Sequence, residues 1–122
     1  MAPRNIIIAL LLSATLNLAS AQTAENPQET GESLKYQCEG YDRMLGHASR
    51  QFDDFNGPRC YGYIQGVTEA LDGTAFCLPV ITLAQKVQTV QAFLSMHLTR
   101  LKEDAVKLVI ESLAEVYPCS KQ

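Results

Sequence analysis

The sequence lacks the short motifs that mark the common catalytic sites. It has no G-x-S-x-G nucleophile elbow, no G-x-x-x-x-G-K-[ST] phosphate loop and no G-x-G-x-x-G dinucleotide motif. The absence of C-x-x-C disfavours a redox-active thiol pair and a structural zinc site. Histidine is scarce, with only His47 and His97. We therefore expect a protein that is not an enzyme, holds no metal or cofactor, and acts by binding.

The sequence also has no excess of positive charge, since its formal net charge is −3. Nucleic acids and anionic membrane surfaces attract strongly basic proteins, so neither is expected as a partner. Weak acidity is compatible with a basic protein partner but does not by itself identify one.

No apolar run reaches the roughly 20 residues that a membrane-spanning helix needs. The longest lies at residues 6–12 (IIIALLL), behind Arg4 and ahead of the small residues Ala19, Ser20 and Ala21. This order is typical of a cleaved signal peptide. We predict a signal peptide at residues 1–21, a polar disordered tail at residues 22–31 and one domain at residues 32–122.

The apolar residues recur at helical spacing, and no alternating pattern predicts a strand. We expect helices over about residues 32–45, 58–71 and 83–96, with core-facing positions that extend to Leu45 in the first. Thr82 and Gln85 predict a capping box for the third helix, and Thr99 is a candidate cap for a fourth, whose apolar stripe runs to Val116. The fold class is a small all-α, four-helix antiparallel bundle.

Residues 47–58 are expected to form a loop, with Pro58 in the first turn of the second helix. Asp53 and Asp54 lie in this segment. Adjacent carboxylates rarely point the same way, and the spacing around them does not match a calcium loop. We interpret both as solvated loop residues.

The four cysteines behind a signal peptide predict two disulfides, for which three pairings exist. In an antiparallel bundle, the ends of the second and fourth helices bring Cys77 beside Cys119. The same geometry places Cys38 of the first helix on the side that faces Cys60. We therefore predict Cys38–Cys60 and Cys77–Cys119.

A row of small residues, Gly62, Gly66 and Ala70, follows one side of the second helix. Glycine within a helix costs about 1 kcal/mol relative to alanine, so the row predicts close approach of another backbone. That backbone belongs either to the same chain or to a second subunit. The nearby aromatic residues Tyr61, Tyr63 and Phe76 are interpreted as core and groove wall.

From Cys60 onward, an ordered set of motifs appears. It comprises CYGYIQGV at residues 60–67, FCLP at 76–79, the helix start at Thr82, Leu94-x-x-His97, Leu108-Val109 and Tyr117-Pro118-Cys119. With Cys38 in the first helix, this set resembles the Tai-type immunity proteins of type VI secretion amidase effectors, which include the Rap group. The resemblance covers about residues 32–119.

The resemblance implies a periplasmic all-α protein with two disulfides, often a homodimer, that binds and blocks a secreted peptidoglycan amidase. It places partner binding in the connection between the third and fourth helices, at Met96, His97, Leu98, Thr99 and Arg100. The family usually has a proline and then an acidic residue after the histidine, whereas Leu98 and Thr99 follow His97 here. Independently of the family, the end of a helix favours a structural role for His97.

Two other classes of function fit the residues. A small disulfide-bonded periplasmic chaperone would use protonation of its carboxylates at acid pH to expose apolar surface. A carrier would hold an apolar ligand between Tyr61, Tyr63 and Phe76.

Overall fold

The computed structural model describes residues 27–120, so the predicted signal peptide at residues 1–21 lies outside the described part. The elements in chain order are α1 (Gly31–Leu45), α2 (Asp53–Leu71), α3 (Leu83–Met96), the short 3₁₀ helix η1 (Leu98–Arg100) and α4 (Ala105–Val116). Residues 27–120 contain no strand beyond two isolated bridges. The predicted small all-α fold with four helices is confirmed.

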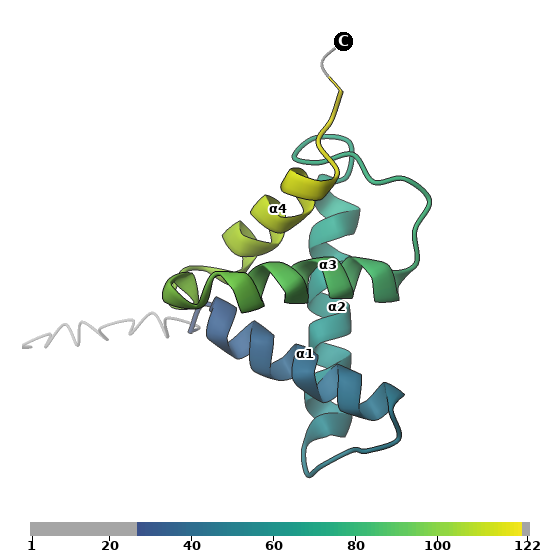
Figure 1. Cartoon of the computed structure of the whole chain (residues 1–122), viewed down its shortest axis with the longest axis vertical. Helices are drawn as coiled ribbons and strands as arrows, with labels where there is room; N and C mark the ends of the chain where they lie inside the picture. The colour runs from purple at the N-terminus through teal and green to yellow at the C-terminus, as the bar shows by residue number, and fades with distance from the viewer. Residues whose placement is uncertain (1–26, 121–122) are drawn as a thin grey trace, which may run out of the picture.

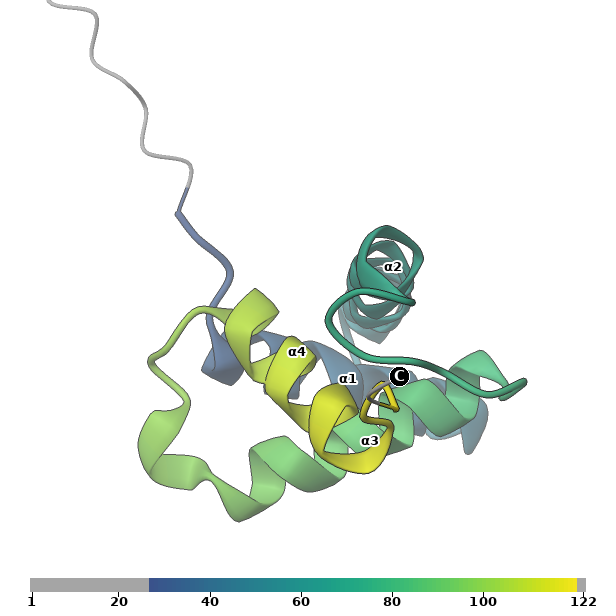
Figure 2. The ribbon, with the colours of Figure 1, turned by 90° about the horizontal axis from the view of Figure 1, so that it is seen from above.

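Helix α2 lies across the other three helices. It runs vertically behind α1 and α3 in Figure 1 and is seen end-on in Figure 2, where the other three lie across the view. Helices α3 and α4 lie side by side and are joined by the segment that contains η1. The core fills the space between α2 and the other three helices.

The core combines residues of all four helices with Phe76 from the α2–α3 connection. Its buried members are Leu34, Cys38, Cys60, Ile64, Phe76, Val87, Val90, Phe93, Leu94, Ala105, Leu108, Val109 and Leu113. Each large apolar side chain buried in this way contributes about 1.5–3 kcal/mol. Two residues predicted on core faces are instead exposed, Leu45 at 59% and Val116 at 55%. Both lie at the last position of their helix.

Both predicted disulfides are confirmed. Cys38–Cys60 joins α1 to α2 with its Cα atoms 5.0 Å apart, and Cys77–Cys119 joins the α2–α3 connection to the chain after α4 at 4.8 Å. The first bridge is fully buried, whereas Cys77 is exposed. In the loop-entropy account, bridges of these loop lengths each stabilise a domain by roughly 3–4 kcal/mol.

Helix α2 begins five residues before the predicted start, so Pro58 lies inside the helix. The prediction that Asp53 lies in a solvated loop is wrong, because Asp53 is 1% exposed in the first turn of α2. The helix N-terminus favours a carboxylate there, and the Arg43 guanidinium compensates its charge. Asp54 belongs to the same turn and is exposed, as expected.

The capping box of α3 is confirmed, since Thr82 Oγ1 accepts from Gln85 N–H and Gln85 Oε1 accepts from Thr82 N–H. The predicted cap at Thr99 is wrong, because this residue is part of η1 and α4 begins only at Ala105. The Ala105 N–H instead donates to the Glu29 carbonyl at 2.8 Å. A backbone carbonyl from a distant segment therefore takes the place of a side-chain cap.

The chain ahead of α1 makes hydrogen bonds to other segments from Glu29 onward, within the tail predicted at residues 22–31. Thr30 caps α1 by accepting from Ser33 N–H, and Gly31 N–H donates to the Glu103 carbonyl at 3.0 Å. The Glu29 carboxylate accepts from Gln37 and Arg59. These contacts fasten the start of α1 to the start of α4.

Close helix packing occurs at other glycines than those predicted. A Cβ built on Gly62 or Gly66 meets nothing within 4 Å among residues 27–120. For this part of the chain, the prediction that the row packs within the same chain is therefore wrong. A Cβ on Gly57 would overlap the Met44 sulfur and lie 3.2 Å from Tyr41 Cα, and one on Gly40 would lie 3.1 Å from Asp53. Gly40 and Gly57 therefore permit the close crossing of α1 and α2.

Candidate functional site

The connection between α3 and α4 presents two apolar side chains to solvent. Met96 is 79% exposed and Leu98 is 62% exposed, and Thr99 beside them is also exposed. His97 and Arg100 are half-buried. Of the five residues predicted to bind a partner, three therefore project outward and two pack against the protein.

His97 ends α3 and packs on the preceding turn. Its ring stacks on Phe93 with the centroids 4.0 Å apart, and its Nδ1 donates to the Phe93 carbonyl at 2.7 Å. This bond satisfies one of the free carbonyls at the end of the helix. His97 thus has the structural role that its position predicted, while its contact with a partner stays a prediction.

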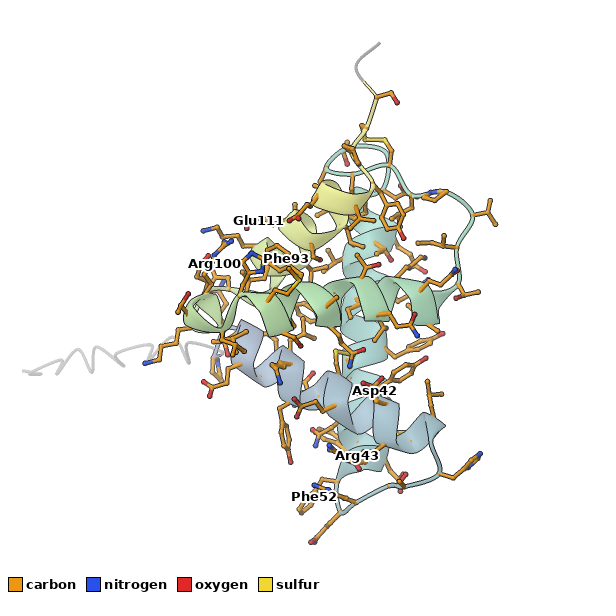
Figure 3. The ribbon with its side chains drawn as sticks, viewed as in Figure 1. Asp42, Arg43, Phe52, Phe93, Arg100 and Glu111 are labelled. Carbon is orange, nitrogen blue, oxygen red and sulfur yellow. A yellow bond between two sulfur atoms is a disulfide. The ribbon has the colours of Figure 1, made fainter. Side chains whose placement is uncertain are left out.

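Arg100 ties the connection to α4. Its Nε and Nη2 donate to the two carboxylate oxygens of Glu103 at 2.8 and 3.0 Å, and Nη2 also lies 2.7 Å from Glu111 Oε2. The guanidinium is 5.9 Å from the centre of the Phe93 ring. Figure 3 shows Arg100, Phe93 and Glu111 gathered at one end of α3.

The charges around Arg100 reinforce one another. Hydrogen bonds from Arg100, and then from Lys107, lower the pKa of Glu103 from 4.5 to about 2. The bonds to Glu103 and Glu111 raise the pKa of Arg100 above its ordinary value. The network therefore stays ionised at neutral pH and holds the connection in one geometry.

Backbone hydrogen bonds stiffen the connection between α3 and α4. Arg100 N–H donates to the His97 carbonyl at 2.9 Å, and Glu103 N–H donates to the Arg100 carbonyl at 2.9 Å. The Leu101 carbonyl accepts from Glu32 N–H at 2.8 Å. Successive turns, anchored on α1, replace the stiffness that a proline would supply.

A groove with a volume of about 430 Å³ lies between α3 and α4 beside this connection. Its size falls within the range of ligand and side-chain binding pockets. Met96 and His97 line one end, and the rest is formed by Gln85, Gln88, Thr89, Ala92, Phe93, Ser112, Glu115, Val116 and Tyr117. The sequence did not reveal this groove, because its residues come from two helices and follow no motif.

Of the three aromatic residues interpreted as core and groove wall, Phe76 is confirmed in the core and Tyr63 packs against it. Phe76 is fully buried, Tyr63 is half-buried and Tyr61 is 47% exposed on α2. None of the three lines the groove between α3 and α4. The row Gly62, Gly66 and Ala70 lies on an exposed side of α2, apart from the residues of the connection.

Residues 27–120 show neither a metal-binding cluster nor a helix able to cross a membrane. These residues include no group of three or more His, Cys, Asp or Glu side chains that could hold a metal ion. No helix among them has both the length and the apolar character to cross a membrane.

The comparisons with known proteins give one match. No curated protein and no solved structure matches the chain. The family profile described as "Rap1a immunity proteins" matches residues 30–119, a stretch that holds all four helices and all four cysteines. An immunity protein family implies binding of a secreted effector protein. The chain therefore belongs to the Rap1a immunity protein family.

Proposed function

We propose that this protein is a periplasmic immunity protein that binds and blocks a peptidoglycan amidase delivered by a type VI secretion system. Family membership over residues 30–119 carries the general part of this proposal. The binding segment is the α3–α4 connection, at Met96, His97, Leu98, Thr99 and Arg100. The observation that supports this segment is the exposure of Met96 and Leu98 on a stiffly held turn.

Blocking by such a segment follows from its chemistry. Methionine is enriched in the cores of protein interfaces, and burying Met96 and Leu98 would contribute about 1.5–3 kcal/mol each. Because Arg100 and His97 already fix the turn, little conformational entropy is lost on binding. A rigid apolar projection of this kind suits insertion into the substrate cleft of an enzyme.

The compartment and the oligomeric state belong to the same proposal. Two disulfides persist in an oxidising compartment such as the periplasm, in agreement with the signal peptide predicted at residues 1–21. We propose a homodimer in which Gly62, Gly66 and Ala70 face the second copy. Support for this comes from the open space beside these glycines, since a Cβ on Gly62 or Gly66 would meet no other segment of residues 27–120 within 4 Å.

The direct test is capture of an amidase from type VI secreted extracts by the purified oxidised protein, followed by an assay of peptidoglycan cleavage. Met96→Glu and Leu98→Glu each place a charge in the proposed contact and should weaken inhibition by about tenfold or more. Val80→Glu is the matched control, because Val80 is fully exposed in the α2–α3 connection. Recovery of no amidase, or equal inhibition by all four proteins, would contradict the proposal.

A further inference from the structure

The groove between α3 and α4 is continuous with the proposed binding segment, since Met96 and His97 belong to both. We propose that this groove receives a basic side chain, arginine or lysine, from the effector protein. The inference rests on the proposed function and adds a second contact to it. Recognition would then combine a projection that enters the partner with a groove that receives a residue of the partner.

The charge of the groove favours a cation. Glu115 is its one carboxylate, and neither lysine nor arginine lines it. Glu115 forms no ion pair with any residue of the described chain, in contrast to Glu103 and Glu111. A cation placed in the groove would therefore pair with a carboxylate that is not already committed.

Some of the uncharged polar side chains of the groove already form hydrogen bonds, and others have no hydrogen-bond partner among the described residues. Thr89 Oγ1 donates to the Gln85 carbonyl, Ser112 Oγ donates to the Val109 carbonyl, and the Gln85 side chain is engaged in the capping box. The Gln88 side chain has no hydrogen-bond partner among the described residues. Gln88 and Glu115 thus offer acceptor oxygens to an incoming donor.

The inner surface of the groove fits the stem of a long basic side chain. Phe93, Ala92 and Val116 supply apolar surface, and Phe93 is almost fully buried. Arginine and lysine bury their methylene groups on such surface while the charged head reaches polar groups at the rim. An acidic side chain would meet Glu115 with like charge, and a purely apolar one would leave the acceptors unused.

A first experiment needs no effector. The oxidised protein, labelled with ¹⁵N, is titrated with N-acetyl-leucyl-arginine amide and with its glutamate counterpart while amide shifts are recorded. With the arginine peptide, we expect saturable amide shifts around Phe93, Glu115 and Val116. The glutamate peptide should bind about threefold to fivefold more weakly. Glu115→Gln should remove this preference, whereas Asp54→Asn, at an exposed site in the first turn of α2, should preserve it. Absence of saturable shifts, or equal binding of both peptides, would overturn the inference.

A second experiment uses the amidase captured by the native protein. Glu115→Lys should weaken its binding by about tenfold, and Asp54→Lys, which changes the net charge equally at an exposed site away from the proposed interfaces, should leave it unchanged. If Met96→Glu abolishes binding but Glu115→Lys does not alter it, the groove inference fails and the proposed function stands. If the native protein binds no amidase, the proposed function fails and the peptide titration alone decides the role of the groove.

Discussion

The Arg43 guanidinium donates two hydrogen bonds to the Asp53 carboxylate, from Nε to Oδ2 at 2.8 Å and from Nη2 to Oδ1 at 2.7 Å. Asp53 Oδ2 also accepts from Arg50 N–H at 2.6 Å. One carboxylate therefore joins α1, the α1–α2 loop and the first turn of α2. Within this loop the bulky residue Phe52 adopts a left-handed conformation with φ of 72°. Such a conformation is costly, and the bonds to Asp53 help to fix it.

Loss of the Asp53 charge should destabilise the fold. Asp53→Asn keeps the shape of the side chain but leaves the half-buried Arg43 without its counter-ion. We expect the thermal midpoint to fall by roughly 10 °C in circular dichroism. Asp54→Asn is the matched control at the adjacent exposed position and should change the midpoint by less than about 2 °C. Equal effects of the two substitutions would rule out this role for the ion pair.

The same carboxylate makes stability depend on acid pH. The hydrogen bonds from Arg43 and then Arg50 lower the pKa of Asp53 from 3.8 to about 2. A carboxylate whose pKa is lowered by folding stabilises the native state above its ordinary pKa, and this contribution disappears as pH falls through the folded value. The difference in thermal midpoint between the wild type and Asp53→Asn should therefore shrink between about pH 5 and pH 2. A difference that stays constant over this window would contradict the assignment.

The two groups of glycines should respond in opposite ways to alanine. In the monomer, Gly62→Ala and Gly66→Ala should each stabilise by about 0.5–1 kcal/mol, because both sites are helical and open. Gly57→Ala should destabilise at the crossing of α1 and α2, because its Cβ would lie 3.2 Å from the backbone Cα of Tyr41, which cannot move aside as the flexible Met44 side chain can. Urea unfolding at several protein concentrations measures both effects. If Gly62→Ala and Gly66→Ala instead weaken a concentration-dependent dimer, the row lies in the subunit interface.

Thr82 and Thr99 both resemble helix caps in the sequence, but they should contribute differently to the free energy of unfolding. Thr82→Ala removes a capping box and should cost about 1 kcal/mol, whereas Thr99→Ala removes no cap and should be close to neutral. Unfolding by denaturant distinguishes them, with Thr82→Ser as a variant that retains the capping hydroxyl. A loss for Thr99→Ala as large as that for Thr82→Ala would show that Thr99 makes an unrecognised contact.

The two disulfides should differ in their response to a mild reductant. Cys77 is exposed, whereas Cys38 and Cys60 are fully buried. Because thiolate attack on a disulfide requires access to a sulfur atom, Cys77–Cys119 should be reduced first. Alkylation followed by mass spectrometry of peptides gives the order. Simultaneous reduction of both bridges would mean that the domain unfolds before either sulfur is reached.

The contrast between α3 and α2 shows what local sequence can predict. The bounds of α3 follow from its cap and its apolar spacing, which are local signals that act within one turn. The start of α2 could not be predicted in this way, because Pro58 and the polar residues before it are typical of a loop. Its first turn forms through a contact ten residues away, between Arg43 and Asp53, for which no local pattern exists.

The candidate site was predictable only in part. The resemblance proposed the α3–α4 connection as the binding segment, but the sequence could not separate the exposed Met96 and Leu98 from the bracing residues His97 and Arg100. That division depends on Phe93 and Glu111, which reach the connection from the two flanking helices. The groove depends in the same way on how α3 and α4 pack, which hydrophobic periodicity does not specify.

Each disulfide closes between cysteines that are consecutive in the chain, with separations of 22 and 42 residues. A chain that emerges N-terminus first therefore presents Cys38 and Cys60 before Cys77 exists as a competitor. Pairing in order of appearance already yields the native connectivity, so no reshuffling of a wrong bridge is needed during assembly.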